Sequence, residues 1–281
     1  MPEFTHLHVH SEYSLLDGLS RLPDLCQTAQ GFGIKSLALT DHGVMYGAVE
    51  FAHAAEEYDL KPIIGCEVYL APRLMHQKDP AHDAHPYHLV LLAENETGYR
   101  NLLKLVTKAH LDGYYYKPRV DKPLLAQHKD GLIALSGCRS GEIPRLILQG
   151  STRKARDAAI WYRDTFGAGN FYLELQRHKG LPELDQVNAE LIAMGRSLGI
   201  PLVATNDAHY VRAEDAAAQE LLLCIQTGTT MNDPKRMQMG SPDYHLRSPE
   251  EMTALFAEIP EALQNTMVIA HVMAHCDFFK N

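Results

Sequence analysis

The chain has no long apolar run and few features of an exported protein. No stretch approaches the ~18 uninterrupted apolar residues of a membrane helix, and MPEFTHLHVH shows neither a basic segment nor an apolar core of a secretory signal. The five cysteines are scattered along the sequence and form no C-x-x-C pair; they are Cys26, Cys66, Cys138, Cys224 and Cys276. A disulfide framework is therefore not expected, and these features indicate a cytoplasmic location without membrane contact.

An excess of positive charge is also missing. The formal net charge of −9 argues against a long non-specific face for nucleic acid, which needs clustered Lys and Arg. A local nucleic-acid site stays compatible with this charge, because bound divalent cations contribute positive charge that side chains do not. A length of 281 residues with 46% hydrophobic residues suits one large globular domain.

Short apolar runs alternate with helical patterns along the chain. The expected strands are 4–9, 36–40, 61–70, 87–93, 131–136, 170–176 and 201–205, and the expected helices are 22–32, 46–58, 96–111, 152–166 and 183–198. Seven such alternations predict an α/β fold with a parallel sheet, most simply a closed (β/α) barrel, with a doubly wound open sheet as the alternative. Helices starting at 248 and covering 260–274 are expected to pack outside the barrel core of about 1–225, in a helical extension of about 226–281.

Metal-ligand residue types gather near the strand ends. In LHVHSEYSLLDG, His8 and His10 alternate and so share one face of an extended segment. His42 follows the second strand, Asp207 and His209 follow the last, and further candidates come from strands and their ends: Asp17, Glu67, His88 and Cys138. In (β/α) barrels chemistry sits at the carboxyl ends of the strands, so these side chains are expected to meet there.

Nine ligands of mixed nitrogen, oxygen and sulfur type favour Zn²⁺, Mn²⁺ or Fe²⁺ over Ca²⁺ or Mg²⁺. The number exceeds what one tetrahedral ion needs and predicts two to three divalent ions. Clusters of this kind characteristically hydrolyse phosphate esters. Cys138 is a ligand in this interpretation, since no partner for a nucleophilic cysteine is visible.

The order of these motifs resembles the polymerase-and-histidinol-phosphatase (PHP) superfamily. GYRNLLKLVTKA, GYYYKPRVD, GLIALSGC and SPDYHLRSPEEM further resemble the N-terminal PHP domains of bacterial replicative DNA polymerase III alpha subunits, over the whole chain. The resemblance implies a distorted seven-stranded (β/α) barrel with three ion positions. Their ligands would be His8, His10, Glu67 and Asp207 for the first; Glu67, His88 and Cys138 for the second; Asp17, His42 and His209 for the third.

The resemblance also implies an activity and partners. Active members are metal-dependent 3′–5′ exonucleases, so we expect a proofreading-type phosphodiesterase that acts on DNA 3′ ends beside the rest of the polymerase chain and other replicase subunits. His10, Glu67 and Asp207 are the expected catalytic residues. Two alternatives remain: a catalytically silent metal-binding structural module, and a phosphatase of the histidinol-phosphate type.

The segment GYYYKPRV combines aromatic rings with cations. Tyrosine rings stack on bases and cations contact phosphates, so Tyr116, Lys117 and Arg119 are expected to bind substrate. The alternative is a packed tyrosine cluster on a loop.

Overall fold

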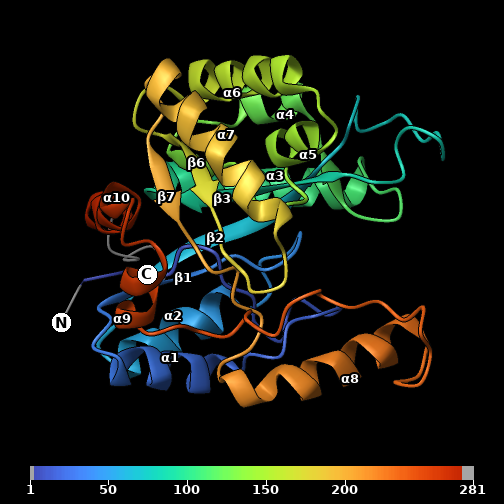
Figure 1. The fold of residues 1–281 in the computed structure, drawn as a ribbon. Helices are drawn as coiled ribbons and strands as arrows, with labels where there is room; N and C mark the ends of the chain where they lie inside the picture. The colour runs from blue at the N-terminus through green and yellow to red at the C-terminus, as the bar shows by residue number, and fades with distance from the viewer. Residues whose placement is uncertain (1–2, 274–281) are drawn as a thin grey trace.

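A seven-stranded sheet, curled into a distorted barrel, forms the centre of the molecule (Figure 1). The computed structural model describes residues 3–273. The strands follow the order β1-β2-β3-β5-β6-β7, with β4 beside β2. Their bounds are β1 (Ser36–Leu39), β2 (Lys61–Leu70), β3 (Tyr87–Ala93), β4 (Arg119–Val120), β5 (Leu132–Leu135), β6 (Phe171–Leu175) and β7 (Leu202–Ala204). The expected α/β barrel is confirmed.

The N-terminal segment closes this barrel without forming a regular strand. Isolated parallel bridges join His6 to Leu37 of β1 and Val9 to Ala208, just beyond β7. The His10 amide donates to the Ala208 carbonyl at 2.7 Å, and the Ala208 amide donates to the His8 carbonyl at 3.1 Å. The two histidines thus lie where the first and last parts of the barrel meet.

The expectation of an all-parallel sheet is wrong at β3. This strand runs antiparallel to both β2 and β5. A parallel neighbour requires a crossover connection, usually a helix, that carries the chain back to the other end of the sheet. Residues 71–86 contain no helix, so β3 starts at the end where β2 finishes. His88 near the start of β3 therefore lies at the carboxyl ends of the parallel strands.

Helices surround the sheet, and most of them lie on its outer side. Their bounds are α1 (Leu22–Gly31), α2 (Ala48–Glu57), α3 (Glu96–Leu111), α4 (Lys122–Gln127), α5 (Glu142–Leu148), α6 (Thr152–Phe166), α7 (Glu183–Leu198), α8 (Ala216–Thr227), α9 (Pro249–Leu255) and α10 (Pro260–Val272). α3 illustrates why they form: the Asn95 side chain caps it by accepting from the Gly98 amide, and Leu102, Leu105 and Val106 face the core. The five helices expected from periodicity are present, whereas α4, α5 and α8 were not anticipated.

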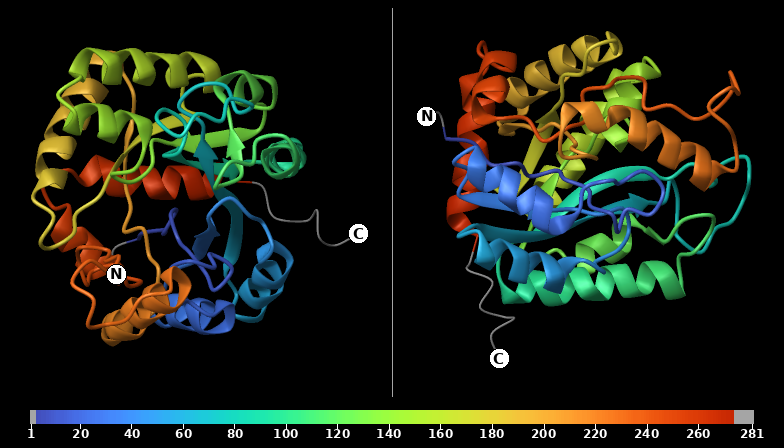
Figure 2. Two further views of the ribbon diagram at one scale, coloured as in Figure 1. Left: turned by 90° about the vertical axis from the view of Figure 1, so that its right-hand side faces the viewer. Right: turned by 90° about the horizontal axis from the view of Figure 1, so that it is seen from below.

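The C-terminal helix α10 does not lie on the outside of the barrel, as the sequence suggested. Ile269 and Ala270 belong to the buried cluster that fills the barrel interior with Leu7, Ile63 and Val90. The left view of Figure 2 shows α10 between the upper and lower halves of the molecule. An apolar helix face completes the core because the short strands alone leave that end open. Residue 274, the last of the expected helix, lies outside the described residues.

Within residues 3–273, no helix is both long enough and apolar enough to span a membrane.

Candidate metal centre

Four of the expected ligands converge where the N-terminal segment meets β2 and the segment after β7. Asp207 Oδ1 lies 3.1 Å from both His8 Nε2 and His10 Nε2, and Glu67 Oε1 lies 3.3 Å from His8 Nε2. Asp207 adopts a left-handed backbone with φ of 50°, which aspartate tolerates better than most residues. All four side chains are buried. Their nitrogen and oxygen atoms are spaced as ligands around one shared ion would be.

A second group also contacts Glu67, through the same Oε1 atom that faces His8. Glu67 Oε1 lies 2.9 Å from His88 Nδ1 and 3.8 Å from Cys138 Sγ, while Cys138 Sγ lies 3.8 Å from His88 Nδ1. Gly137 places the thiol here: it has a left-handed φ of 80°, and a Cβ at this position would lie 2.7 Å from the His88 carbonyl oxygen. Glu67 is therefore shared between the first and second groups.

The third group consists of Asp17, His42 and His209. Asp17 Oδ2 lies 3.3 Å from His42 Nε2 and 3.8 Å from His209 Nε2. His42 also contacts Glu67, with 2.5 Å between Nδ1 and Oε2, so it stands between the second and third groups. The structure thus brings together all nine residues that the sequence singled out as ligands.

The hydrogen bonds of this cluster show why cations fit it. Among residues 3–273, several buried polar atoms of the cluster lie close to other polar atoms but make no hydrogen bond of acceptable geometry: His8 Nε2, His10 Nε2, Asp17 Oδ1, His42 Nδ1, Glu67 Oε2, Asp207 Oδ1 and His209 Nε2. Buried polar groups without partners are rare in native proteins because each one costs ~1–3 kcal/mol. Coordination of divalent ions would satisfy these lone pairs together, so the donor set fits the expected metals.

Comparison with known proteins agrees with this geometry. The family model described as "PHP domain" matches residues 6–178. The chain belongs to the PHP domain family. DNA polymerase III subunit alpha of Treponema pallidum (strain Nichols) is 49% identical over 268 residues, covering 95% of this chain and 23% of that protein. The same subunit of Borreliella burgdorferi is 46% identical over 279 residues, covering 99% of this chain and 24% of that protein.

This PHP domain thus spans about a quarter of the length of the curated relatives it matches. Among solved structures, an amidohydrolase from Chromobacterium violaceum is similar, with a TM-score of 0.45 and 15% identity. That match covers 74% of this chain and 88% of the other.

Charge coupling in the PHP domain is strong. Burial alone would lower the pKa of His8, but the carboxylates of Asp207, Glu174 and Glu67 raise that pKa well above its usual value. Burial opposes ionisation of Glu67, yet neighbouring imidazoles hold its pKa well below the usual value. Burial, together with two nearby imidazoles, lowers the pKa of His10 to about 3. Metal binding would therefore displace protons from some of these histidines.

Two side chains that sequence analysis missed hold the ligands in place. Glu174 on β6 is buried and contacts His8 Nδ1 at 2.7 Å, and it also accepts from the Gly137 amide at 3.0 Å. Ser14 Oγ lies 3.0 Å from His10 Nδ1 and donates to Asp41. Such partners orient metal-bound imidazoles. Glu174 could have been recognised, since it interrupts the apolar strand FYLELQ as Glu67 interrupts IIGCEVY.

The segment after α8 positions Asp207 and His209. The Asn206 side chain donates to the carbonyls of Asp243 and His245 at 2.9 and 2.7 Å. The His209 amide donates to the Tyr244 carbonyl at 2.7 Å. This segment contains the sequence SPDYHLRSPEEM. Part of the polymerase-like sequence that supplies no ligand therefore supports the loop that carries Asp207 and His209.

His178 is a further residue that sequence analysis missed. Its ring stacks on Tyr244 with 4.1 Å between centroids, and both ring nitrogens lack a hydrogen-bond partner although the residue is only 7% exposed. It lines a cavity of about 130 Å³ together with Asp207 and His209. No motif flagged it, because a single histidine after a strand has no distinctive pattern.

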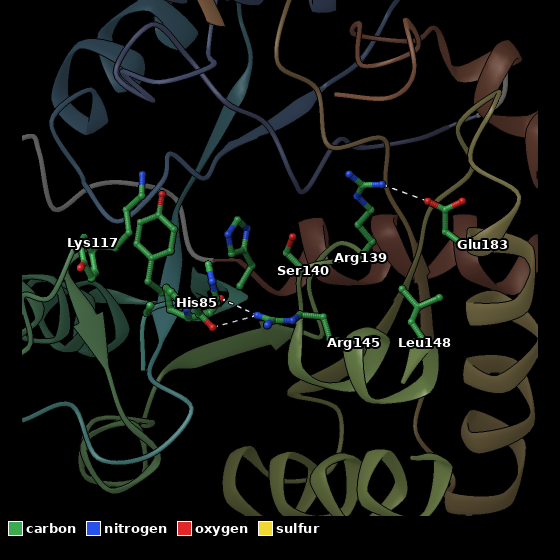
Figure 3. A pocket seen from close by; sticks show the side chains of 12 residues that line it. His85, Lys117, Arg139, Ser140, Arg145, Leu148 and Glu183 are labelled. Atoms are coloured by element: carbon green, nitrogen blue, oxygen red, sulfur yellow. Dashed lines mark hydrogen bonds and ion pairs between the residues drawn. The ribbon is translucent and has the colours of Figure 1, made fainter. Parts of the chain in front are cut away.

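The expected phosphate contact of Arg119 is wrong. Arg119 is fully buried, and its guanidinium donates to main-chain carbonyls. The acceptors and distances are Gly113 at 3.1 Å, Asp83 at 3.1 Å, Met75 at 2.8 Å and Gln77 at 3.0 Å. These bonds tie residues 71–86 to the tyrosine segment. Tyr116 and Lys117 instead line a cleft beside the cluster (Figure 3).

Proposed function

We propose that this chain is the N-terminal PHP domain of a replicative DNA polymerase III alpha subunit. We further propose that it is a metal-dependent phosphodiesterase that removes nucleotides from DNA 3′ ends as a proofreading-type exonuclease. The observation that carries the catalytic proposal is a cluster of seven buried polar atoms that make no hydrogen bond. Four of the residues that carry them line one cavity: Asp17, His42, Asp207 and His209. The similarity to polymerase subunits supports DNA as the substrate.

Two to three ions of Zn, Mn or Fe would be held by the nine ligands in the groups described above. When bound, such ions supply Lewis acidity toward phosphoryl oxygens and lower the pKa of water. Glu67, His10 and Asp207 would hold these ions as the catalytic residues of the site. Glu174 and Ser14 keep the His8 and His10 rings oriented. His178 offers a ring nitrogen to a phosphate oxygen, because neither nitrogen is used within the protein.

Partners follow from the same proposal. The rest of the polymerase chain and other replicase subunits would surround this domain in the cytoplasm, and the substrate would be a DNA 3′ end.

Steady-state cleavage of a 3′-labelled single strand by the purified chain tests the activity. We expect release of nucleotides when Mn²⁺ or Zn²⁺ is added and none in chelator. A matched strand with a blocked 3′ end should resist cleavage, because an exonuclease of this polarity needs the free terminus. Absence of turnover with every divalent ion would contradict the proposal.

The second candidate is a metal-bound structural module of the polymerase. It is favoured by the position of the ligands, which join the N-terminal segment, β2, β3 and the segment after β7, so ions there would hold the barrel closed. Elemental analysis showing bound metal together with absent turnover would favour this candidate. Release of phosphate from monoesters, without cleavage of a strand, would favour a phosphatase of the histidinol-phosphate type.

A further inference from the structure

A cleft of about 520 Å³ opens next to the cavity of the metal centre. Both hollows are lined by His88, Arg139 and Ser140, so the cleft leads to the ligand cluster. Figure 3 shows Lys117 and His85 on one side of the cleft and Arg139 and Glu183 on the other. A chain that lies along the cleft can therefore place its end at the metal centre.

The charges of the cleft suit a polyanion. Three cations line it, and its one carboxylate, Glu183, already pairs with Arg139 at 3.1 Å. Lys117 Nζ lies 5.3 Å from the centre of the Tyr69 ring and has no carboxylate partner among residues 3–273. Arg145 is held by the carbonyls of His85 and Pro86 at 3.1 and 3.0 Å. In a chain with net charge −9, this local excess of positive charge is distinctive.

One wall of the cleft carries the exposed ring of Tyr116, which packs on Tyr115 and, through it, on Arg119. The Arg119 guanidinium lies 5.1 Å from the Tyr115 ring centre, and the Tyr115 and Tyr116 rings lie 4.5 Å apart. Tyr116 is 64% exposed and has a left-handed φ of 59°, which is uncommon for a bulky residue. Backbone strain that exposes a large ring is typical of functional surfaces.

We propose that this cleft binds the last nucleotides of single-stranded DNA, with a base stacked on Tyr116 and phosphates beside Lys117 and Arg139. The proposal rests on the proposed function, because it explains how a 3′ end reaches the ligands. Stacking on an exposed ring requires an unpaired base, so a single strand fits the cleft and a duplex does not. Arg119 acts here as a positioning residue that holds the two loops of the wall together.

Fluorescence anisotropy with a labelled octathymidine tests the proposal. Phosphorothioate linkages keep the strand intact, and Mn²⁺ keeps the metal centre loaded. Tyr116→Ala and Lys117→Ala should each raise Kd about tenfold, since stacking contributes ~1–3 kcal/mol per base and 1.4 kcal/mol is tenfold. Tyr116→Phe should restore binding. Lys117→Ala should also reduce the salt dependence, because one phosphate contact is lost.

Two exposed residues outside the cleft serve as matched controls. Tyr114 is 53% exposed and precedes Tyr116 by two residues, and Lys154 is exposed on α6. Tyr114→Ala and Lys154→Ala should therefore leave Kd within twofold of wild type. Equal affinities in the cleft and control variants, or duplex binding as tight as single-strand binding, would overturn the proposal. Because the probe is not cleaved, lack of turnover would count against the proposed function and leave the binding result standing.

Discussion

The surroundings of Arg119 and those of Glu67 are both buried and polar, yet their hydrogen bonds differ in kind. All three guanidinium nitrogens of Arg119 donate to main-chain carbonyls. In the cluster that contains Glu67, seven buried polar atoms from β2 and several loops lie close together without making hydrogen bonds. A satisfied buried network fixes a fold, whereas an unsatisfied one needs an additional group. Arg119 is thus a charged residue that stabilises the fold, whereas the charged residues around Glu67 could hold cations.

The largest expected effect is on catalysis at the unsatisfied cluster. Asp207→Asn should lower kcat for strand cleavage about a thousandfold, because a lost ion position is worth several kcal/mol and each 1.36 kcal/mol is tenfold. Asp59→Asn is the matched control, since Asp59 also has a left-handed φ, 54°, but lies exposed. Wild-type rates in Asp207→Asn would place catalysis elsewhere.

Removal of metal from the same cluster should lower the stability of the folded chain. Ions that bind only the folded chain stabilise it by about 4 kcal/mol at a thousandfold excess over Kd. We expect chelation to lower Tm by roughly 10 °C, given ~2–4 °C per kcal/mol in chains near this size. Calorimetry with and without chelator measures the shift, which should be smaller in Asp207→Asn. Identical melting curves for the wild type would contradict metal binding.

The satisfied network should respond to mutation without involving metal. Arg119→Met leaves four carbonyls without their donor, so the free energy of unfolding should fall by about 3 kcal/mol. Urea denaturation measures this fall, and Arg153→Met on the exposed face of α6 should change it little. Metal content should stay at the wild-type value in both variants. A loss of bound metal in Arg119→Met alone would show that the two clusters are coupled.

A smaller effect is expected from the unpartnered ring beside the ligands. His178→Phe keeps an aromatic ring on Tyr244 but removes both nitrogens, so kcat should fall about tenfold, the value of one hydrogen bond of ~1.4 kcal/mol. Metal content and Tm should remain close to wild type. His53→Phe on the exposed face of α2 is the control. Unchanged kcat in His178→Phe would mean that this histidine only packs.

The smallest effect is a pH slope that separates the metal-free from the metal-loaded chain. The pKa values of His8 and His42 are raised in the folded chain: burial lowers them, but nearby carboxylates outweigh it. The two protonated histidines contribute their full stabilisation below a pH of about 6.5, the histidine pKa in the unfolded chain. This stabilisation is lost as the pH rises through their pKa in the folded chain. Between pH 7 and 9 the chelated chain should therefore lose about 1.4 kcal/mol per pH unit for each of these histidines that stays protonated in the folded chain.

The metal-loaded chain should lose no stability over this range, because ligands bind as neutral imidazoles and high pH favours them. Urea denaturation at several pH values, with and without chelator, measures both slopes. Parallel slopes would contradict metal binding through His8 and His42.

Strand positions and ligand types could be predicted from local sequence, but strand direction could not. The apolar run at β3 suits a parallel or an antiparallel strand equally well. The connection from β2, which contains no helix, makes β3 antiparallel to β2. The same holds for α10, whose apolar residues suit an outer layer or the barrel interior equally well. The barrel end that α10 fills exists only once the strands have curled.

The sequence by itself indicated the barrel and the nine ligand types, because alternating apolar runs and His, Asp, Glu and Cys at strand ends are local patterns. The family followed from the resemblance of its motifs. Tertiary structure decided the role of each polar residue. In the sequence, Arg119 follows three tyrosines, as a phosphate-binding residue could. In the structure, residues 71–86 cover it, and their main-chain carbonyls accept its hydrogen bonds. Glu174 and His178 become part of the centre only through contacts far along the chain, since burial and hydrogen-bond partners are properties of the packed molecule.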